Sequence, residues 1–226
     1  MFEGFSQQTI DFMWGLRLNN NKVWFEENKG RFVEDFQKPM KALGAEVFEK
    51  IKSEQASKGF IHKVSRIYKD ARRVHDGQPY RCNLWFSIEK PMGDEWTSTP
   101  VFWFDLSPES WSYGLGYYSA KAATMAKLRA RIDKEPKAFE KLIAPLERQK
   151  EFVLDGDEYK RKKEAPSLKT DPWYNKKSLS LIHNQENGQE LFSRNLADRI
   201  VEGYKFLMPF YEYFITLDND PDPKGV

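Results

Sequence analysis

The sequence predicts an α+β protein with a central antiparallel β-sheet, packed by N-terminal, middle and C-terminal helices. Apolar residues recur at helical spacing near both ends of the chain, whereas residues 62–117 contain short runs in which apolar and polar side chains alternate. These runs follow one another with short connections, which favours a meander of about four to six antiparallel strands over a parallel sheet. No segment has the composition of a linker between domains, so a single domain is expected over residues 1–217. Residues 218–226 are acidic and Pro-rich and are expected to form a disordered tail.

The N-terminal quarter of the chain has the pattern of two helices. Ser6 or Thr9 is expected to cap the first, and the polar run at residues 19–21 stops it. The same asparagines can cap a second helix that extends over residues 22–53, where apolar residues recur near helical spacing. Pro39 has no amide hydrogen to donate, so it is expected to kink or split this second helix.

Four strands are expected after the second helix. Their ranges are residues 62–70, 81–89, 100–106 and 111–117. In the second of them the even-numbered residues from Cys82 to Ile88 are apolar, and the odd-numbered residues from Arg81 to Glu89 are mainly polar or amphipathic. Successive side chains of a strand point to opposite faces, so one face of this strand is expected to pack on the core. Cys82, on the apolar face, is read as a small buried hydrophobe and not as a nucleophile.

The C-terminal half returns to helices with two more short strands. Ser119 can cap a helix that is followed by another opening at Pro136. Strands are expected over residues 151–154 and 178–183, with a long charged loop between them. The last helix is expected over residues 195–214, interrupted by a proline.

Several protein classes are excluded or disfavoured by the sequence. No apolar stretch approaches the roughly 18–20 residues that span a bilayer, so no membrane partner is expected. The N-terminus does not resemble a secretory signal, and cytoplasmic residence is the default expectation. His62, His75 and His183 are far apart in sequence and lack metal-type spacing, so no metal is expected. Neither a P-loop nor a serine-hydrolase or kinase signature is present, and we expect no cofactor.

The charge of the chain is uneven although its formal net value is only +2. Residues 58–81 hold seven basic and two acidic residues, and residues 121–150 hold nine basic and four acidic ones. Between them, residues 82–120 carry five acids and one lysine. The near-neutral total disfavours a general polyanion binder, but the basic segments point to a local anion site.

Residues 66–80 contain the strongest candidate site. If Arg66, Lys69 and Arg72 converge near the start of the helix that follows Tyr118, they form a pocket for phosphate or carboxylate groups, because the guanidinium fork binds such groups bidentately. If the protein is an enzyme, Asp70 is the candidate general acid or base. The alternative is that these are solvated charges, with Asp70 paired locally to Arg72.

Tyr80 and five other residues complete the candidate site, each with a structural alternative. Tyr80 would hydrogen-bond a substrate, or belong to the core. Trp24 and Asn28 share a helix face. Trp24 would form an apolar wall of the site, and Asn28 would hydrogen-bond the ligand. In the structural alternative Trp24 belongs to the core and the amide of Asn28 bonds the neighbouring loop. Asn20 is expected nearby. Gly114 and Gly116 lie at the end of a predicted strand, just before a predicted helix. There they would let an anion approach the backbone amides at the start of the helix, or they would form a tight turn.

Two motifs carry a resemblance to a known family. The first contains Asn19-Asn20, Trp24-Phe25, Asn28, Lys29 and Pro39; the second contains residues 66–72 (RIYKDAR) and Pro79-Tyr80-Arg81. With Gly114, Gly116 and the helix after them, the chain resembles the mainly bacterial domain-of-unknown-function family 2461 from about Phe5 to Leu217. The resemblance implies no reaction. Arg73 and residues 76–78 depart from the pattern, since a Phe and a Lys are expected there, and any role of that lysine is in doubt or has moved to Arg73.

The sequence therefore predicts a protein whose basic pocket binds a small anionic ligand. The alternatives are a non-enzymatic module that binds nucleic acid or protein through residues 121–150 and 158–177, and a purely structural network of Arg, Asp and Tyr side chains. Whether the protein is an enzyme, and its oligomeric state, are left open.

Overall fold

The chain divides into two compact units. The computed structural model describes residues 1–52, 59–70, 72, 74–91 and 98–223. The first unit comprises Met1–Ile88, Trp103–Tyr113 and Asn184–Gly203; the second comprises Glu89–Phe102, Gly114–His183 and Tyr204–Val226. The single domain expected over residues 1–217 stays a prediction.

The strands form one six-stranded antiparallel sheet in the order β1-β2-β3-β4-β6-β5, as the fold class predicted. Their bounds are β1 (Ile61–Val64), β2 (Leu84–Glu89), β3 (Pro100–Leu106), β4 (Ser110–Tyr117), β5 (Val153–Asp155) and β6 (Ser180–Glu186). The first four are sequential neighbours, which confirms the meander. β5 pairs with β6, with Leu154 opposite Leu181.

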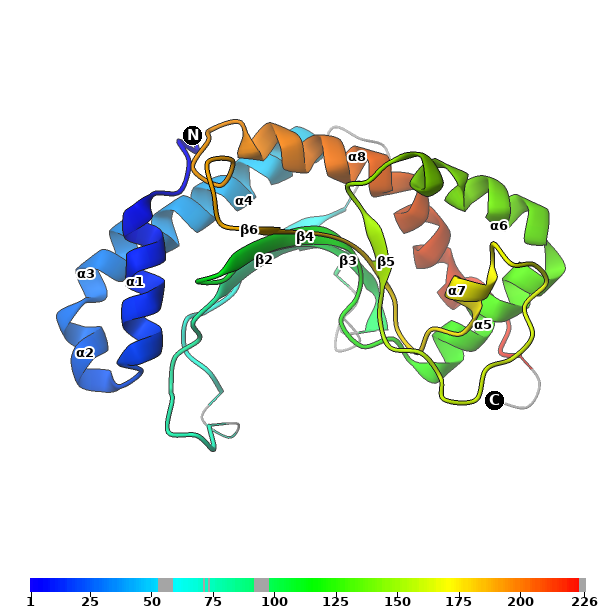
Figure 1. Cartoon of the computed structure of the whole chain (residues 1–226), viewed down its shortest axis with the longest axis horizontal. Coiled ribbons are helices and arrows are strands. Elements are labelled where there is room, and N and C mark those ends of the chain that lie inside the picture. Colours follow the sequence, from blue (N-terminus) through cyan, green and yellow to red (C-terminus); the bar gives the residue numbers. More distant parts are fainter. Residues whose placement is uncertain (53–58, 71, 73, 92–97, 224–226) are drawn as a thin grey trace. The chain divides into compact units, whose positions relative to one another are not determined.

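The first unit begins with a group of helices, coloured blue in Figure 1. These are α1 (Gln7–Leu18), α2 (Lys22–Glu27), α3 (Lys29–Arg31), the π-helical segment η1 (Phe32–Gln37) and α4 (Lys38–Ile51). Ser6 stands at the N-cap of α1, and Asn21 caps α2 because its Oδ1 accepts the N–H of Trp24 at 3.0 Å. The expected second helix is therefore split into four pieces.

Pro39 splits the predicted helix at the change from π to α geometry. It cannot donate a hydrogen bond to the carbonyl of Asp35, four residues earlier. The hydroxyl of the buried Thr9 donates to that carbonyl instead, at 2.5 Å. Helix α1 thus satisfies the backbone group that the proline leaves without its usual partner.

The core of the first unit lies on the apolar face of β2. Phe86 stacks on Phe104 with ring centroids 5.5 Å apart, and α4 packs against β1. Gly44 of α4 permits this approach, because a Cβ there would lie 2.2 Å from Nε2 of His62. The predicted strand is confirmed, although it starts at Leu84 and not at Arg81, and Ser87 and Glu89 on its second face are buried as well.

The strand predicted over residues 62–70 ends early, at Val64. Beyond it the chain forms a single bridge between Tyr68 and Tyr80. The ring of Tyr80 stacks on Phe25 of α2, with centroids 4.1 Å apart, and Ile67 is buried. Tyr68 and Tyr80 therefore pack on Phe25 of α2 in their own unit, while backbone hydrogen bonds still join the two arms of the hairpin beyond Val64.

The second unit groups three helices near the C-terminal part of α8 (Figure 1). They are α5 (Ala122–Lys134), α6 (Pro136–Ile143) with the 3-10 turn η5 (Ala144–Arg148), and the short α7 (Asp171–Tyr174), which the sequence did not predict. α8 (Leu196–Ile215) contributes residues 204–215 to this unit and continues through Pro209. Burial of Leu207, Phe210 and other apolar residues around the proline offsets the lost hydrogen bond.

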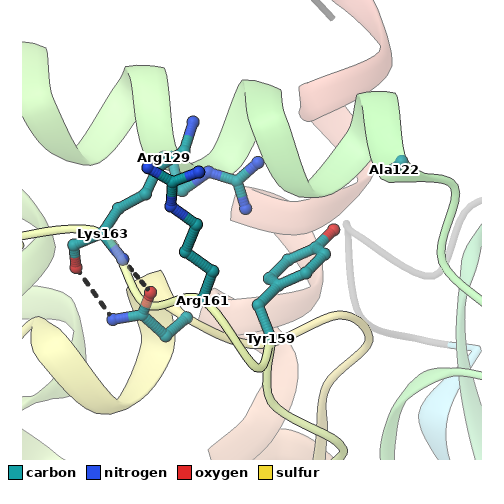
Figure 2. A pocket seen from close by; sticks show the side chains of 6 residues that line it. Ala122, Arg129, Tyr159, Arg161 and Lys163 are labelled. Atoms are coloured by element: carbon teal, nitrogen blue, oxygen red, sulfur yellow. Dashed lines mark hydrogen bonds between the residues drawn. The ribbon is translucent and has the colours of Figure 1, made fainter.

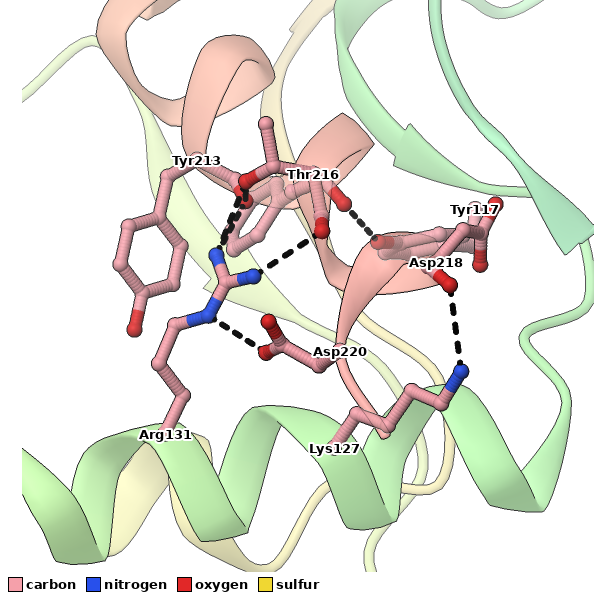
Figure 3. A network of polar contacts seen from close by, with 8 residues as sticks. Tyr117, Lys127, Arg131, Tyr213, Thr216, Asp218 and Asp220 are labelled. Carbon is pink, nitrogen blue, oxygen red and sulfur yellow. Dashed lines mark hydrogen bonds and ion pairs between the residues drawn. The ribbon is translucent and has the colours of Figure 1, made fainter. Parts of the chain in front are cut away.

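The C-terminal segment after α8 is attached to α5, whereas the sequence predicted disorder from residue 218. The 3-10 helix η6 (Thr216–Asn219) follows α8, and Nε of Arg131 donates to Oδ2 of Asp220 at 2.7 Å (Figure 3). Leu217 is buried. Pairing with basic residues of α5 gives the acidic segment a place on the fold; residues 224–226 lie outside the described part.

Candidate functional site

An open pocket in the first unit collects all three predicted cationic site residues. Its volume is about 760 Å³, within the roughly 300–1,000 Å³ typical of ligand sites. We call it the hairpin pocket; the described residues that line it are Lys63, Val64, Ser65, Arg66, Tyr68, Lys69, Asp70, Arg72, Arg81 and Trp85. The structure thus brings together Arg66, Lys69, Asp70 and Arg72 from the sequence prediction.

Backbone hydrogen bonds hold the two strands of the hairpin in register around this pocket. The N–H of Lys69 donates to the carbonyl of Pro79 at 2.9 Å, and the N–H of Arg81 donates to that of Ile67 at 2.7 Å. Closer to the sheet, the N–H of Ser65 donates to the carbonyl of Trp85 at 2.8 Å. The cationic side chains therefore project from a backbone that is fixed on both sides.

Two of the cations are engaged by carboxylates of the hairpin itself. Arg72 donates to Asp70 through Nε at 3.1 Å and Nη2 at 2.7 Å, and its backbone N–H donates to Oδ1 at 3.0 Å. The carboxylate of Asp70 raises the pKa of the Arg72 guanidinium. Nζ of Lys69 lies 3.2 Å from Oδ2 of Asp76. The local pairing of Asp70 with Arg72 is the arrangement that the sequence offered as the alternative to a converging anion site.

Arg66 and Arg81 differ from these two cations. Within the described part of the chain neither guanidinium has a hydrogen-bonding or carboxylate partner, although both line the pocket. Lys63 adds a further ammonium group to the lining. Against five basic side chains the described lining contains one carboxylate, that of Asp70, and it is occupied by Arg72. The pocket therefore has an excess of positive charge, with donors available to an anion.

Aromatic side chains supply the apolar part of the lining. Trp85 is half-buried on β2, on the face opposite to Phe86. Tyr68 is 51% exposed, and its ring meets Phe25 edge-on with centroids 5.9 Å apart. A ligand in this pocket would meet cations and ring faces together.

Asn20 and Tyr80 hold the hairpin in place and do not belong to the described lining. Oδ1 of Asn20 accepts the backbone N–H of Tyr80 at 3.0 Å, and its Nδ2 donates to the carbonyl of Tyr80 at 2.9 Å. Tyr80 is 3% exposed, and burial raises the pKa of its phenol. Asn20 thus ties the loop after α1 to the hairpin, and the substrate contact assigned to Tyr80 stays a prediction.

Trp24 and Asn28 serve the packing of the N-terminal helices. The indole of Trp24 lies against α1, where a Cβ on Gly15 would be 2.8 Å from it. Nδ2 of Asn28 donates to the carbonyl of Trp24 at 2.9 Å at the end of α2. Neither residue belongs to the described lining of the hairpin pocket. Trp24 is half-buried and the Asn28 amide bonds a carbonyl of its own helix, so the ligand roles given for both residues stay predictions.

Gly114 and Gly116 lie inside β4 in the second unit, and not in a turn before a helix. Their φ angles are not positive, so backbone freedom is not what requires glycine there. At Gly116 a Cβ would lie 2.6 Å from the carbonyl oxygen of Leu179. This glycine therefore permits close pairing with the chain that enters β6. Neither glycine belongs to the described lining.

Sequence reasoning missed Lys63, Tyr68, Arg81 and Trp85 as lining residues. The alternation of residues 81–89 contained the signal, since it placed Arg81 and Trp85 on the face opposite to the core. Sequence reasoning also did not single out Asp105 as a titratable group with a shifted pKa. Its carboxylate accepts a hydrogen bond from Nδ2 of Asn83 at 2.6 Å, and burial raises its pKa to about 6. Arg73 lies outside the described residues.

No cluster of three or more His, Cys, Asp or Glu that could hold a metal ion occurs in the part of the chain that the structure describes. In the same part, no helix is both long and apolar enough to cross a membrane.

A comparison with known families gives a match over most of the chain. The model of the conserved hypothetical protein family DUF2461 matches residues 8–213 of the 226. The match includes every residue that lines the hairpin pocket and confirms the resemblance predicted from the sequence motifs. No curated protein matches the chain.

Proposed function

Because the chain belongs to DUF2461, a family described as conserved hypothetical proteins, we propose its function from the pocket alone: it binds a small anionic ligand in the hairpin pocket. The observation that carries the proposal is the pair of guanidinium groups, Arg66 and Arg81, that line an open pocket with no described partner of their own. Phosphate and carboxylate groups match the planar fork of arginine, which donates two parallel hydrogen bonds to either of them.

The size and lining of the pocket define the ligand further. A volume of about 760 Å³ exceeds a single phosphate or carboxylate group, so the ligand has a body as well as a charge. Tyr68 and Trp85 offer ring faces for an apolar or aromatic body. Asp70 orients Arg72 through its two oxygens, and this supports a binding role for that pair over proton transfer.

A thermal-shift screen with the full chain tests the proposal. The probes are inorganic phosphate, pyrophosphate, citrate and acetate, each at constant ionic strength. An anion that binds the folded state raises its stability by about 2.7 kcal/mol at a hundredfold excess over Kd. We expect at least one multivalent anion to raise the melting temperature, and the rise to shrink in the Arg66→Gln/Arg81→Gln variant.

The control is Lys41→Gln, an exposed cation on α4 that is not in the pocket lining. It should keep the full rise. If no anion stabilises the unaltered chain, or if the double variant responds as the control does, the proposal is wrong.

A nucleic-acid strand is the second candidate, favoured by the exposed ring of Tyr68 among cations. Salt separates the two: binding of a single strand through several phosphates weakens steeply between 50 and 200 mM salt, by about 300-fold when six phosphates are contacted. A small anion held by two arginines should lose far less affinity over the same range.

A further inference from the structure

The second unit contains its own basic pocket, which the proposed function does not use. It is a small cavity of about 140 Å³ between α5 and the chain before and after α7. We call it the Arg129 pocket; the described residues that line it are Ala122, Arg129, Tyr159, Arg161, Lys163 and Asn175. Figure 2 shows that the side chains of Arg129, Arg161 and Lys163 gather beside the helix.

The three cations of the Arg129 pocket have no carboxylate between them. In the described part of the chain no ion pair joins Arg129, Arg161 or Lys163 to an acid. Neighbouring acids are engaged elsewhere: Glu158 lies 2.7 Å from Nζ of Lys162, and Asp133 accepts the hydroxyl of Tyr174 at 2.9 Å. Three like charges that share a cavity repel one another unless an anion lies between them.

Arg129 provides an independent indication of a missing acceptor. Its Nη1 is buried and has no hydrogen-bond partner among the described residues. Its guanidinium carbon lies 5.4 Å from the ring centroid of Tyr159, which fixes the group over an aromatic face. A buried guanidinium nitrogen without an acceptor is unfavourable, and an oxyanion in the cavity would satisfy it.

The loop that carries the other two cations is preorganised by Asn175. This buried side chain accepts the backbone N–H of Lys163 at 2.9 Å and donates to the carbonyl of Lys163 at 3.1 Å. The backbone carbonyl of Asn175 accepts the N–H of Tyr159 at 2.9 Å. The backbone of the loop is therefore held on α7's side of the pocket before any ligand arrives, which lowers the entropy lost on binding.

We propose that the Arg129 pocket binds a single phosphate group, free or as the terminal group of a phosphate monoester. The cavity is too small for a nucleotide-sized ligand, which needs several hundred Å³. Three cations exceed the charge of one carboxylate and suit a dianion with several acceptor oxygens. Arg161 and Lys163 are exposed, so the group can enter from solvent.

Calorimetric titration of the full chain with inorganic phosphate tests the proposal. We expect the Arg161→Gln/Lys163→Gln variant to bind phosphate at least tenfold more weakly than the unaltered chain. The matched control Lys137→Gln, an exposed cation on α6 outside the lining, should bind as the unaltered chain does. Equal affinity of the double variant and the control would overturn the proposal.

Two further titrations define the ligand and separate this site from the hairpin pocket. Phenyl phosphate that binds more tightly than inorganic phosphate would support a monoester, and the reverse would support the free ion. Acetate that binds as tightly as phosphate would overturn the assignment. Phosphate affinity should survive Arg66→Gln/Arg81→Gln; if that variant alone abolishes binding, the Arg129 site is refuted and the proposed function stands.

Discussion

Replacing Arg131 by Ala is expected to detach the C-terminal segment from α5. The guanidinium donates to Oδ2 of Asp220 at 2.7 Å, to the carbonyl of Tyr213 at 3.0 Å, and to Oγ1 and the carbonyl of Thr216 at 2.9 and 3.0 Å (Figure 3). It also lies 4.9 Å from the ring centroid of Tyr213. One side chain therefore holds four acceptors of one segment.

The loss of stability can be worked from these contacts. A hydrogen bond to a charged group contributes about 1.5–3 kcal/mol, and one between neutral groups about 1 kcal/mol. The acceptors are partly exposed and regain water in the variant, so we expect a total loss of about 2–3 kcal/mol, less than the simple sum. With a urea m-value of about 2 kcal/mol/M, the unfolding midpoint falls by about 1 M.

Urea unfolding and hydrogen exchange measure this effect together. Amides of residues 214–220 should exchange faster in Arg131→Ala, and Arg131→Lys, which keeps the charge but not the fork, should fall between it and the unaltered chain. Lys141→Ala, an exposed position on α6, is the control and should stay within about 0.5 kcal/mol. A midpoint and exchange pattern in Arg131→Ala that match the control would refute the reasoning.

Three further predictions concern other parts of the fold. Burial lowers the pKa of His62 below 6.5, so the free energy of unfolding should decrease as the pH falls below about 6.5. His62→Leu should remove that decrease from the pH dependence of the urea midpoint. An unchanged pH dependence would contradict the role of His62. Gly116→Ala should cost about 1–3 kcal/mol because its Cβ would meet backbone, whereas Gly30→Ala, with nothing within 4 Å, should be neutral or stabilising; equal midpoints would contradict the close approach at β4. Asn20→Ala should cost about 1–3 kcal/mol, since it removes both hydrogen bonds to the backbone of Tyr80, and a loss under about 0.5 kcal/mol would show that other contacts hold the hairpin.

Acid titration tests the Arg131 contact by a second route. The hydrogen bond from Arg131 lowers the pKa of Asp220 below its usual 3.8. The stability that this pair contributes is therefore present above about pH 4 and is lost as the pH falls through the lowered pKa of the folded state. In Asp220→Asn this acid loss should be smaller.

The helices and strands were predictable where one physical period dominated. The patterns of residues 81–89 and 100–106 predicted two strands, and both formed, although β2 is shorter than expected and its Ser87 and Glu89 are buried. The regular strand predicted over residues 62–70 ends at Val64, and beyond it Tyr80 is buried against Phe25 of α2. Such burial depends on residues far away in sequence, which a local pattern does not contain.

The candidate site was predictable in its charge and less so in its membership. Arg66 and Arg72 line the pocket from one hairpin. They are close together in sequence, so local spacing was sufficient to predict that they lie near each other. The side-chain amides of Asn20 and Asn28 bond to backbone groups, those of Tyr80 and Trp24. Local sequence could not decide between a ligand and a backbone partner, since an amide side chain satisfies both equally well.

The affinity of the Arg66→Gln/Arg81→Gln variant for the anion, other than inorganic phosphate, that most stabilises the unaltered chain tests the central claim most directly. Calorimetric titration at low salt gives Kd for both proteins. Loss of two charge-assisted contacts, each about 1.5 kcal/mol or more, predicts a Kd at least a hundredfold higher in the variant. A Kd in the variant within twofold of that of the unaltered chain would contradict the claim that the hairpin pocket binds the anion.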